Sequence, residues 1–213
     1  MKNENQIFQE TAILANGKFP DHPVPLNYLL NAKRVICCDG AANSLIDFGL
    51  EPFAIVGDCD SLNKKVADKY HDRLFRDNDQ ETNDLTKSVK WCHARGYNDI
   101  AILGATGKRE DHTLGNISLL VEYAGLISVK MVTDAGYFFP LLKSGKVDSE
   151  KGQQVSVFSI DPVTEITSDG LRYKLDKKRL SNWWTATLNE AEGDSFTLQF
   201  EGGSLIVFLK FRD

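Results

Sequence analysis

Two aspartates separated by one residue follow a short apolar run in the segment AIVGDCDSL, residues 54–62. In extended backbone, Asp58 and Asp60 point to the same side of the chain, so their carboxylates lie close together. Like charges at that separation repel unless a cation lies between them. Ligation by oxygen atoms alone favours a hard ion, and Mg²⁺ with retained waters and substrate phosphates fits best. The spacing predicts a metal site; the alternative is a polar turn with two solvated acids.

A second polar cluster begins at Asp39, where the apolar start of VICCDGAANSL ends. Gly40 allows the backbone to approach a ligand closely, and the amino end of the helix predicted after it favours an anion. Asn43 adds an amide to the same segment. Asp39 could equally serve only as the N-cap of that helix, and the residues leave both interpretations open.

The third cluster lies in RDNDQETNDLTKSVKWC, residues 76–92. Asp84 begins a predicted helix, and Lys87 follows three residues later on a neighbouring face. Asp84 could supply a third oxygen to the metal while Lys87 reaches a phosphate, and Gln80 and Asn83 offer neutral hydrogen bonds nearby. The alternative is a charged cap followed by an exposed helix.

The fourth cluster is AILGATGKREDHTLGNISLL, residues 101–120. It is not a P-loop, because Ile102 stands where the first glycine is required and Arg109 where a Ser or Thr would hold magnesium. A Gly-rich turn between strand and helix still offers backbone N–H groups to a phosphate. Arg109, His112 and Asn116 share one helical stripe beside that turn. The stripe indicates a ligand site or, alternatively, a solvated face.

Short apolar runs alternate with amphipathic stretches through about residue 140. The predicted strands are rich in β-branched residues and bounded by Gly, Asp or Asn; they are Thr11–Ala15, Arg34–Cys38, Phe53–Val56, Asp99–Leu103 and Val129–Val132. The predicted helices are Ala41–Phe48, Lys64–Tyr70, Asp84–Arg95 and His112–Ala124. This alternation predicts right-handed βαβ units and a parallel sheet. The polar clusters fall mainly at the carboxyl ends of the strands, where open α/β sheets bind ligands.

After Ser144 the pattern changes to short strands separated by DP, SDG, EGD and EGG turn signals. The predicted strands are Gln154–Ser159, Glu165–Thr167, Leu171–Leu175, Trp184–Leu188, Ser195–Phe200 and Leu205–Phe211. Such a run predicts a small antiparallel sandwich or barrel. We expect the boundary near Gly145–Gly152, which gives an α/β domain over 1–145 and a smaller all-β, sandwich-like domain over 146–213.

The composition of the 213 residues, 42% hydrophobic and 26% charged, is that of a globular protein and excludes disordered, collagen-like and coiled-coil classes. A net charge of −5 argues against a broad nucleic-acid surface. No apolar run is long enough to span a membrane, and the polar start MKNENQIFQE resembles no targeting segment. The four cysteines form no CxxC pair and are expected to be reduced. We therefore expect a cytoplasmic protein.

Taken in this order, the clusters resemble the motifs of the thiamin pyrophosphokinase family over most of residues 35–120. The matching motifs are Asp39-Gly40-Ala41-Ala42-Asn43, Gly57-Asp58-Cys59-Asp60-Ser61, Asp79-Gln80 with Asp84-Leu85 and Lys87, and Gly104-Ala105-Thr106-Gly107 with Arg109, Asp111-His112-Thr113-Leu114 and Asn116. Gly170-Leu171-Arg172-Tyr173 and Ser181-Asn182 resemble motifs of the family's thiamin domain. Lys108 stands where the family often has a second glycine.

The resemblance implies transfer of a pyrophosphoryl group from ATP to the hydroxyethyl oxygen of thiamin, giving thiamin diphosphate and AMP. It implies that Mg²⁺ is held by Asp58, Asp60 and Asp84, and that Lys87 and Arg109 stabilise developing charge. Asp39 or a metal-held carboxylate would accept the alcohol proton. Further ATP contacts are implied at Asn43, Gln80, Asn83, Gly104, Thr106, Gly107, Lys108, Arg109, Asp111, His112 and Asn116, and thiamin contacts at Ser181 and Asn182. A homodimer with thiamin bound between subunits is also implied.

Two other functions would use the same acids. One is a different Mg²⁺-dependent nucleotide pyrophosphatase or pyrophosphokinase, for which AMP release without thiamin would argue. The other is a non-catalytic module that binds thiamin or nucleotide without turnover.

Overall fold

The computed structural model describes residues 9–212, and its contacts divide the chain into two compact units. The first unit comprises the described residues up to Asn116 together with Leu126–Asp134, and the second comprises Ile117–Gly125 and the described residues from Ala135 on. Most of the polar start of the chain, residues 1–8, lies outside the described residues. No helix in the part that is described is long and apolar enough to cross a membrane.

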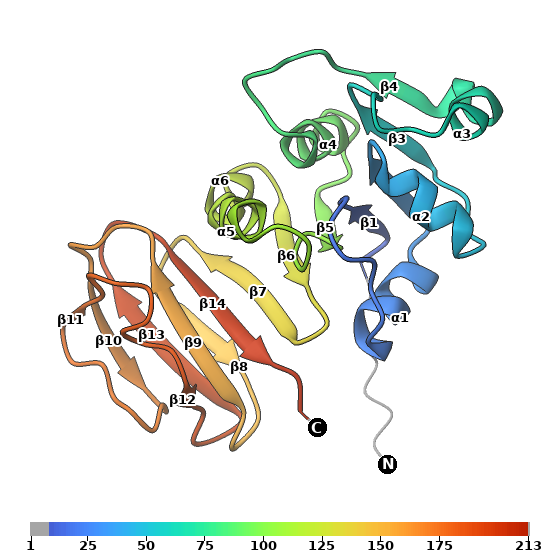
Figure 1. The fold of residues 1–213 in the computed structure, drawn as a ribbon. Coiled ribbons are helices and arrows are strands. Elements are labelled where there is room, and N and C mark those ends of the chain that lie inside the picture. The colour runs from blue at the N-terminus through green and yellow to red at the C-terminus, as the bar shows by residue number, and fades with distance from the viewer. Residues whose placement is uncertain (1–8, 213) are drawn as a thin grey trace. The chain divides into compact units, whose positions relative to one another are not determined.

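The first unit is built on a parallel sheet, as the alternation of strands and helices predicts (Figure 1). Its strands are β1 (Thr11–Leu14), β2 (Arg34–Cys38), β3 (Ala54–Gly57), β4 (Leu74–Arg76), β5 (Asp99–Leu103) and β6 (Ser128–Val132). They lie in the order β4-β3-β2-β1-β5-β6. The chain therefore runs from β1 outward to β4 and then returns to the other side of β1. At such a reversal the loops after adjacent strands diverge and leave a crevice at the carboxyl edge.

Helices follow most of these strands: α1 (Pro23–Asn31), α2 (Ala41–Asp47), α3 (Lys64–Lys69), the 3₁₀ turn η1 (His71–Arg73), α4 (Asp84–His93) and α5 (Glu110–Ser118). Helix α4 packs on β1, β2 and β3. It buries Leu85, Val89 and Cys92, the stripe with helical spacing in the sequence. Its amino end is fixed by Asn83, whose side-chain oxygen accepts a hydrogen bond from Thr86 N at 2.8 Å.

The second unit is a sandwich of two antiparallel sheets, which confirms the predicted fold class. One sheet has the order β12-β9-β14-β7 and the other β11-β10-β13-β8. The strands are β7 (Gly136–Leu141), β8 (Gly145–Asp148), β9 (Gln154–Ser159), β10 (Glu165–Asp169), β11 (Lys178–Arg179), β12 (Asn189–Glu190), β13 (Ser195–Phe200) and β14 (Leu205–Lys210), and the unit also holds α6 (Leu120–Ala124). Both sheets contribute to one buried core, with Val157 and Val207 from the first and Ile166 and Phe196 from the second.

Helix α1 is absent from the sequence prediction because its segment, FPDHPVPLNYLL, contains three prolines. Two of them lie in the first turn of the helix, where proline is tolerated since those N–H groups have no partner within the helix. The side chain of His22 caps the helix by accepting from Val24 N. The short edge strand β4 was also not predicted.

Two predicted strands of the second unit are not strands. Residues 171–175 form bends with a single bridge, Leu171 to Ala191. Residues 184–188 form turns, and Leu188 has a left-handed φ of 56°. Leu171, Leu175 and Ala186 are buried in the core of the sandwich, whereas Trp184 and Leu188 are exposed. The apolar character of these segments therefore predicted the wrong element.

The compact second unit begins earlier than the boundary expected near residues 145–152. The segment Gly136–Leu141 pairs with Leu205–Lys210 over its full length. It therefore belongs with the sandwich, although it follows the α/β pattern directly in the sequence. The predicted helix over 112–124 is divided into α5 and α6, separated only by Leu119.

Candidate active site

A cleft of about 380 Å³ opens at the carboxyl ends of β1, β2, β3 and β5, where the strand order reverses. All of its residues belong to the first unit. Ten residues predicted from the sequence line it: Asp39, Asp58, Asp60, Asn83, Asp84, Thr106, Lys108, Arg109, His112 and Asn116. The fold therefore brings all four sequence clusters to one place.

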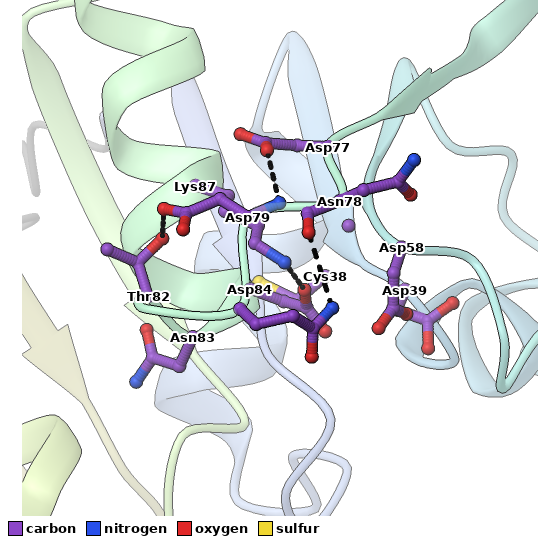
Figure 2. A network of polar contacts seen from close by, with 12 residues as sticks. Cys38, Asp39, Asp58, Asp77, Asn78, Asp79, Thr82, Asn83, Asp84 and Lys87 are labelled. Atoms are coloured by element: carbon purple, nitrogen blue, oxygen red, sulfur yellow. Dashed lines mark hydrogen bonds and ion pairs between the residues drawn. The ribbon is translucent and has the colours of Figure 1, made fainter.

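Three acids meet on one wall of the cleft. Carboxylate oxygens of Asp39, Asp58 and Asp60 lie within 4.8 Å of one another, and Figure 2 shows Asp39 and Asp58 side by side. Asp39 follows β2 and Asp58 follows β3, and these strands are parallel neighbours. Their carboxyl ends therefore reach the same edge of the sheet, which is why residues distant in sequence converge.

Local hydrogen bonds hold the three acids in place. Asp39 Oδ2 accepts from Ser61 N at 3.1 Å, and Asp58 Oδ1 accepts from Asp60 N at 3.3 Å. Ser61 Oγ donates to Asp60 Oδ1 at 2.9 Å. The backbone is left-handed at Asp39 and Cys59, with φ of 39° and 64°. Such conformations cost about 1 kcal/mol or more in non-glycine residues and persist where the surrounding contacts enforce them.

Asp39 has the features of a cation ligand. The residue is only 3% exposed, and its Oδ1 is buried without a hydrogen-bond partner among the described residues. Burial raises the pKa of Asp39, and the nearby charges of Asp84 and Asp58 raise it further, while hydrogen bonds from Ser61 oppose the shift. A buried carboxylate oxygen facing other acids is stabilised by a hard cation. The donor set, oxygen atoms only, fits Mg²⁺.

Asp84 lines the same cleft but has a cationic partner already. Lys87 Nζ donates to Asp84 Oδ1 at 3.2 Å, as Figure 2 shows, and the Lys87 side chain is only 4% exposed. The sequence grouped Asp84 with Asp58 and Asp60 as metal ligands. Among the described residues, the acids whose oxygens lie within one ion's reach are Asp39, Asp58 and Asp60.

The loop after β5 contributes Ala105, Thr106, Lys108 and Arg109 to the lining of the cleft. Arg109 makes a two-pronged pair with Asp111, with Nε–Oδ1 at 3.1 Å and Nη2–Oδ2 at 2.5 Å. This guanidinium lowers the pKa of Asp111 to about 2. Both side chains are largely exposed, so the pair exchanges readily for another anion. Asn116 Nδ2 donates to Ala105 O at 2.8 Å and fixes the start of the loop to α5.

The loop after β1 was missed by the sequence analysis, yet Ala15, Asn16 and Gly17 line the cleft. Gly17 N donates to Gly104 O at 2.7 Å. A Cβ at Gly17 would lie 2.3 Å from that same oxygen, so only glycine fits. The signal in the sequence was the Asn-Gly pair directly after a predicted strand. The other lining residues to which the sequence assigned no role are Cys38, and Ser61, Leu85, Ala105 and Thr113 within the motifs.

Several predicted residues do not line the cleft. Gln80 donates to Asn78 O at 3.4 Å, and Asn43 bridges Ser61 O and Asn63 N at 3.0 and 3.1 Å. The remaining ones in the first unit that are not among the lining residues are Lys87, Gly104, Gly107 and Asp111. Ser181 and Asn182 are exposed residues of the second unit.

Asp39→Asn is expected to raise the melting temperature of the metal-free protein by about 2–4 °C, the equivalent of about 1 kcal/mol. The amide removes a buried charge that neighbouring acids destabilise, and its oxygen can still accept from Ser61 N. Thermal unfolding in EDTA, followed by circular dichroism, measures the shift. A melting temperature below that of the wild type would contradict this account of Asp39.

Comparison with known proteins gives a consistent result over both units. Residues 26–131 match the family model for the thiamin pyrophosphokinase catalytic domain, and residues 136–208 match that for the thiamin pyrophosphokinase substrate-binding domain. The chain is 29% identical over 184 residues to thiamine pyrophosphokinase of Bacillus subtilis, covering 79% of this chain and 83% of that protein. It is 27% identical over 164 residues to thiamin pyrophosphokinase 1 of Caenorhabditis elegans, covering 70% and 67%.

Solved structures show the same fold. The crystal structure of the Bacillus subtilis thiamine pyrophosphokinase has a TM-score of 0.76 at 22% identity, covering 95% of this chain and 100% of that one. The thiamin pyrophosphokinase from Candida albicans has a TM-score of 0.76 at 17% identity, covering 97% and 91%.

Proposed function

The chain belongs to the thiamin pyrophosphokinase family, and from this premise we propose that its first unit binds Mg²⁺ and ATP and its second unit binds thiamin. As an enzyme of this family it transfers a pyrophosphoryl group from ATP to the hydroxyl of thiamin, which gives thiamin diphosphate and AMP. The observation that carries the proposal is the group of three carboxylates in one cleft. Phosphoryl-type transfer depends chiefly on positioning and charge neutralisation.

The cleft residues fit a magnesium ion. We propose Asp58, Asp60 and Asp84 as its ligands, as the sequence implies, and Asp39 as a further one. Asp39 lies in one group with Asp58 and Asp60; Asp84 is outside that group but lines the same cleft, and its Oδ1 accepts from Lys87. When bound, Mg²⁺ neutralises the triphosphate and polarises the phosphorus that is attacked.

The remaining charged residues of the site have distinct roles. Lys87 holds Asp84 in position, and its ammonium group stabilises negative charge on the transferred pyrophosphoryl group. Arg109 exchanges its exposed partner Asp111 for the phosphate of departing AMP. Asp39 or one of the metal-held carboxylates accepts the alcohol proton.

Thiamin is assigned to the second unit, through Ser181 and Asn182. Both residues are exposed, and neighbouring Trp184 presents 75% of its surface to solvent. An exposed aromatic ring offers a face to a cationic ring such as that of thiamin. We propose a homodimer that completes this site. Light scattering over a dilution series, compared with activity, tests the proposal, and a fully active monomer would exclude it.

A cytoplasmic location is the last part of the proposal. It is supported by Cys37, Cys38, Cys59 and Cys92, all of which are free and buried. Thiols remain reduced in the cytosol. Fractionation of cells that produce the chain tests it, and recovery outside the cytosolic fraction would contradict it.

The test of function uses the full-length chain with ATP, Mg²⁺ and thiamin, with nucleotides and thiamin diphosphate separated by chromatography. We expect AMP and thiamin diphosphate in equal amounts, and no product of either kind in EDTA. Equal AMP release without thiamin would identify a nucleotide pyrophosphatase. Binding of thiamin or ATP by calorimetry without any turnover would identify a non-catalytic module.

A further inference from the structure

Asn16 lies in the cleft near the start of the loop that follows β1. Lys108, on the loop after β5, donates from Nζ to Asn16 O at 3.1 Å and to Asn16 Oδ1 at 3.2 Å. The two side chains thus meet across the point where the strand order reverses. Both belong to the first unit.

The contact with Lys108 determines which way the Asn16 amide faces. An ammonium group has three donors and no acceptor, so the atom of the amide that faces it must be the oxygen. The amide nitrogen therefore faces the other way, toward Gly40, where it lies 2.8 Å from the position a Cβ would occupy. Ser61 lies beside Gly40, because a Cβ at Gly40 would be 3.0 Å from Ser61 Cβ, and Ser61 N donates to Asp39 Oδ2. The nitrogen of Asn16 is thus directed at the side of the cleft that carries the acids.

The amide nitrogen of Asn16 makes no hydrogen bond within the described part of the chain. It presents two N–H donors to the cleft from a neutral group. A ligand that uses them must bring an acceptor, and a phosphate oxygen is the acceptor that a cation held by the three acids would also attract.

The side chain of Asn16 is not needed to join the two loops. Their backbones are already joined by Ala15 N to Leu103 O at 2.8 Å, Gly17 N to Gly104 O at 2.7 Å and Lys18 N to Thr106 O at 2.8 Å. Because the backbone already connects the two loops, the side chain of Asn16, which faces the cleft, is available for a ligand.

We propose that Asn16 is a substrate-binding residue whose amide N–H groups donate to a phosphate oxygen of the nucleotide, and that Lys108 is the positioning residue that fixes the amide in this orientation. The inference rests on the proposed function, because it takes the nucleotide as the ligand of the cleft. It assigns a role to a residue outside the sequence motifs, and it changes the role of Lys108 from a direct phosphate contact to a support for Asn16.

Asn16→Asp separates this role from a structural one. The aspartate keeps an acceptor for Lys108 and turns the contact into an ion pair, but it has no N–H to donate and adds a negative charge. We expect the Kd of a non-hydrolysable ATP analogue with Mg²⁺, measured by calorimetry, to rise more than about tenfold, with the melting temperature unchanged or higher. Asn27→Asp, on the exposed face of α1, is the matched control. Wild-type affinity in Asn16→Asp would overturn the proposal.

Lys108→Met tests the positioning role. It leaves the amide of Asn16 in place without its orienting donor, so we expect the Kd and the KM for ATP to rise severalfold while kcat changes little. Lys108→Arg restores a donor and should recover most of the affinity. In the double variant Asn16→Ala with Lys108→Met, the two losses should not add, since both act through one amide. Additive losses would show that Lys108 contacts the nucleotide independently.

The calorimetry also separates this inference from the proposed function. If the wild-type chain binds the ATP analogue and makes no thiamin diphosphate, the proposed function fails while the role of Asn16 is still measured. If the wild-type chain is active and Asn16→Asp binds the analogue normally, only the role of Asn16 fails.

Discussion

Asp58→Asn and Asp60→Asn are each expected to lower kcat by about a thousandfold, the range seen when one preorganised group that stabilises transition-state charge is removed. The two carboxylates lie within 4.8 Å of each other and of Asp39. Asparagine keeps the size and the acceptor oxygen but removes the negative charge that a divalent cation requires. Steady-state rates of thiamin diphosphate formation, with Mg²⁺ varied, measure the effect.

The fold is expected to survive both substitutions. Asp60 is exposed and Asp58 is half-buried, and Asp58 mainly accepts a local bond from Asp60 N. Their circular dichroism spectra should match the wild type. Asp72→Asn, an exposed acid in η1 that lies outside the cleft, is the control and should retain full activity. Wild-type kcat in either Asp58→Asn or Asp60→Asn would remove the metal site from the mechanism.

The sequence predicted the convergence of these acids for a physical reason. Asp39 and Asp58 each come directly after an apolar run of strand length, and parallel strands place their carboxyl ends at one edge. The alternation of strands and helices was sufficient to predict the parallel sheet, even though the strand order was not predictable. The local sequence pattern therefore predicted the part of the site that the ends of the strands position.

The parts that were not predicted depend on contacts between distant segments. Asn16 is in the cleft because backbone hydrogen bonds join its loop to the loop after β5. Such hydrogen bonds do not depend on side-chain type, so the sequence does not reveal them. One unpredicted contact is local instead: Asp84, which the sequence grouped with the other acids, pairs with Lys87 three residues later in α4. In the second unit, the segment 184–188 turns instead of extending. It is held by distant residues of β9, since Val157 N donates to Ala186 O and Leu188 N donates to Ser156 Oγ.

Lys87→Met is expected to lower kcat by about a hundredfold to a thousandfold. Lys87 is buried, and its ammonium lies 3.2 Å from Asp84 Oδ1. Methionine preserves the packing of the aliphatic stem within α4 but removes the only cation that hydrogen bonds to Asp84 among the described residues. Asp84 then faces the other acids without compensation, and the transferred group loses a neighbouring positive charge. Single-turnover rates at saturating Mg²⁺ and ATP measure this effect apart from binding.

The loss of the pair should also lower the free energy of unfolding by about 1–2 kcal/mol, less than for a fully buried pair because the Asp84 side chain is 31% exposed. Asp84→Asn combined with Lys87→Met removes both charges, so it should recover that stability without recovering activity. Lys90→Met, an exposed lysine one position outside the buried face of α4, should leave both quantities unchanged. Recovery of kcat in the double variant would mean that Lys87 serves only to neutralise Asp84, and its role in stabilising the transferred group would then be excluded.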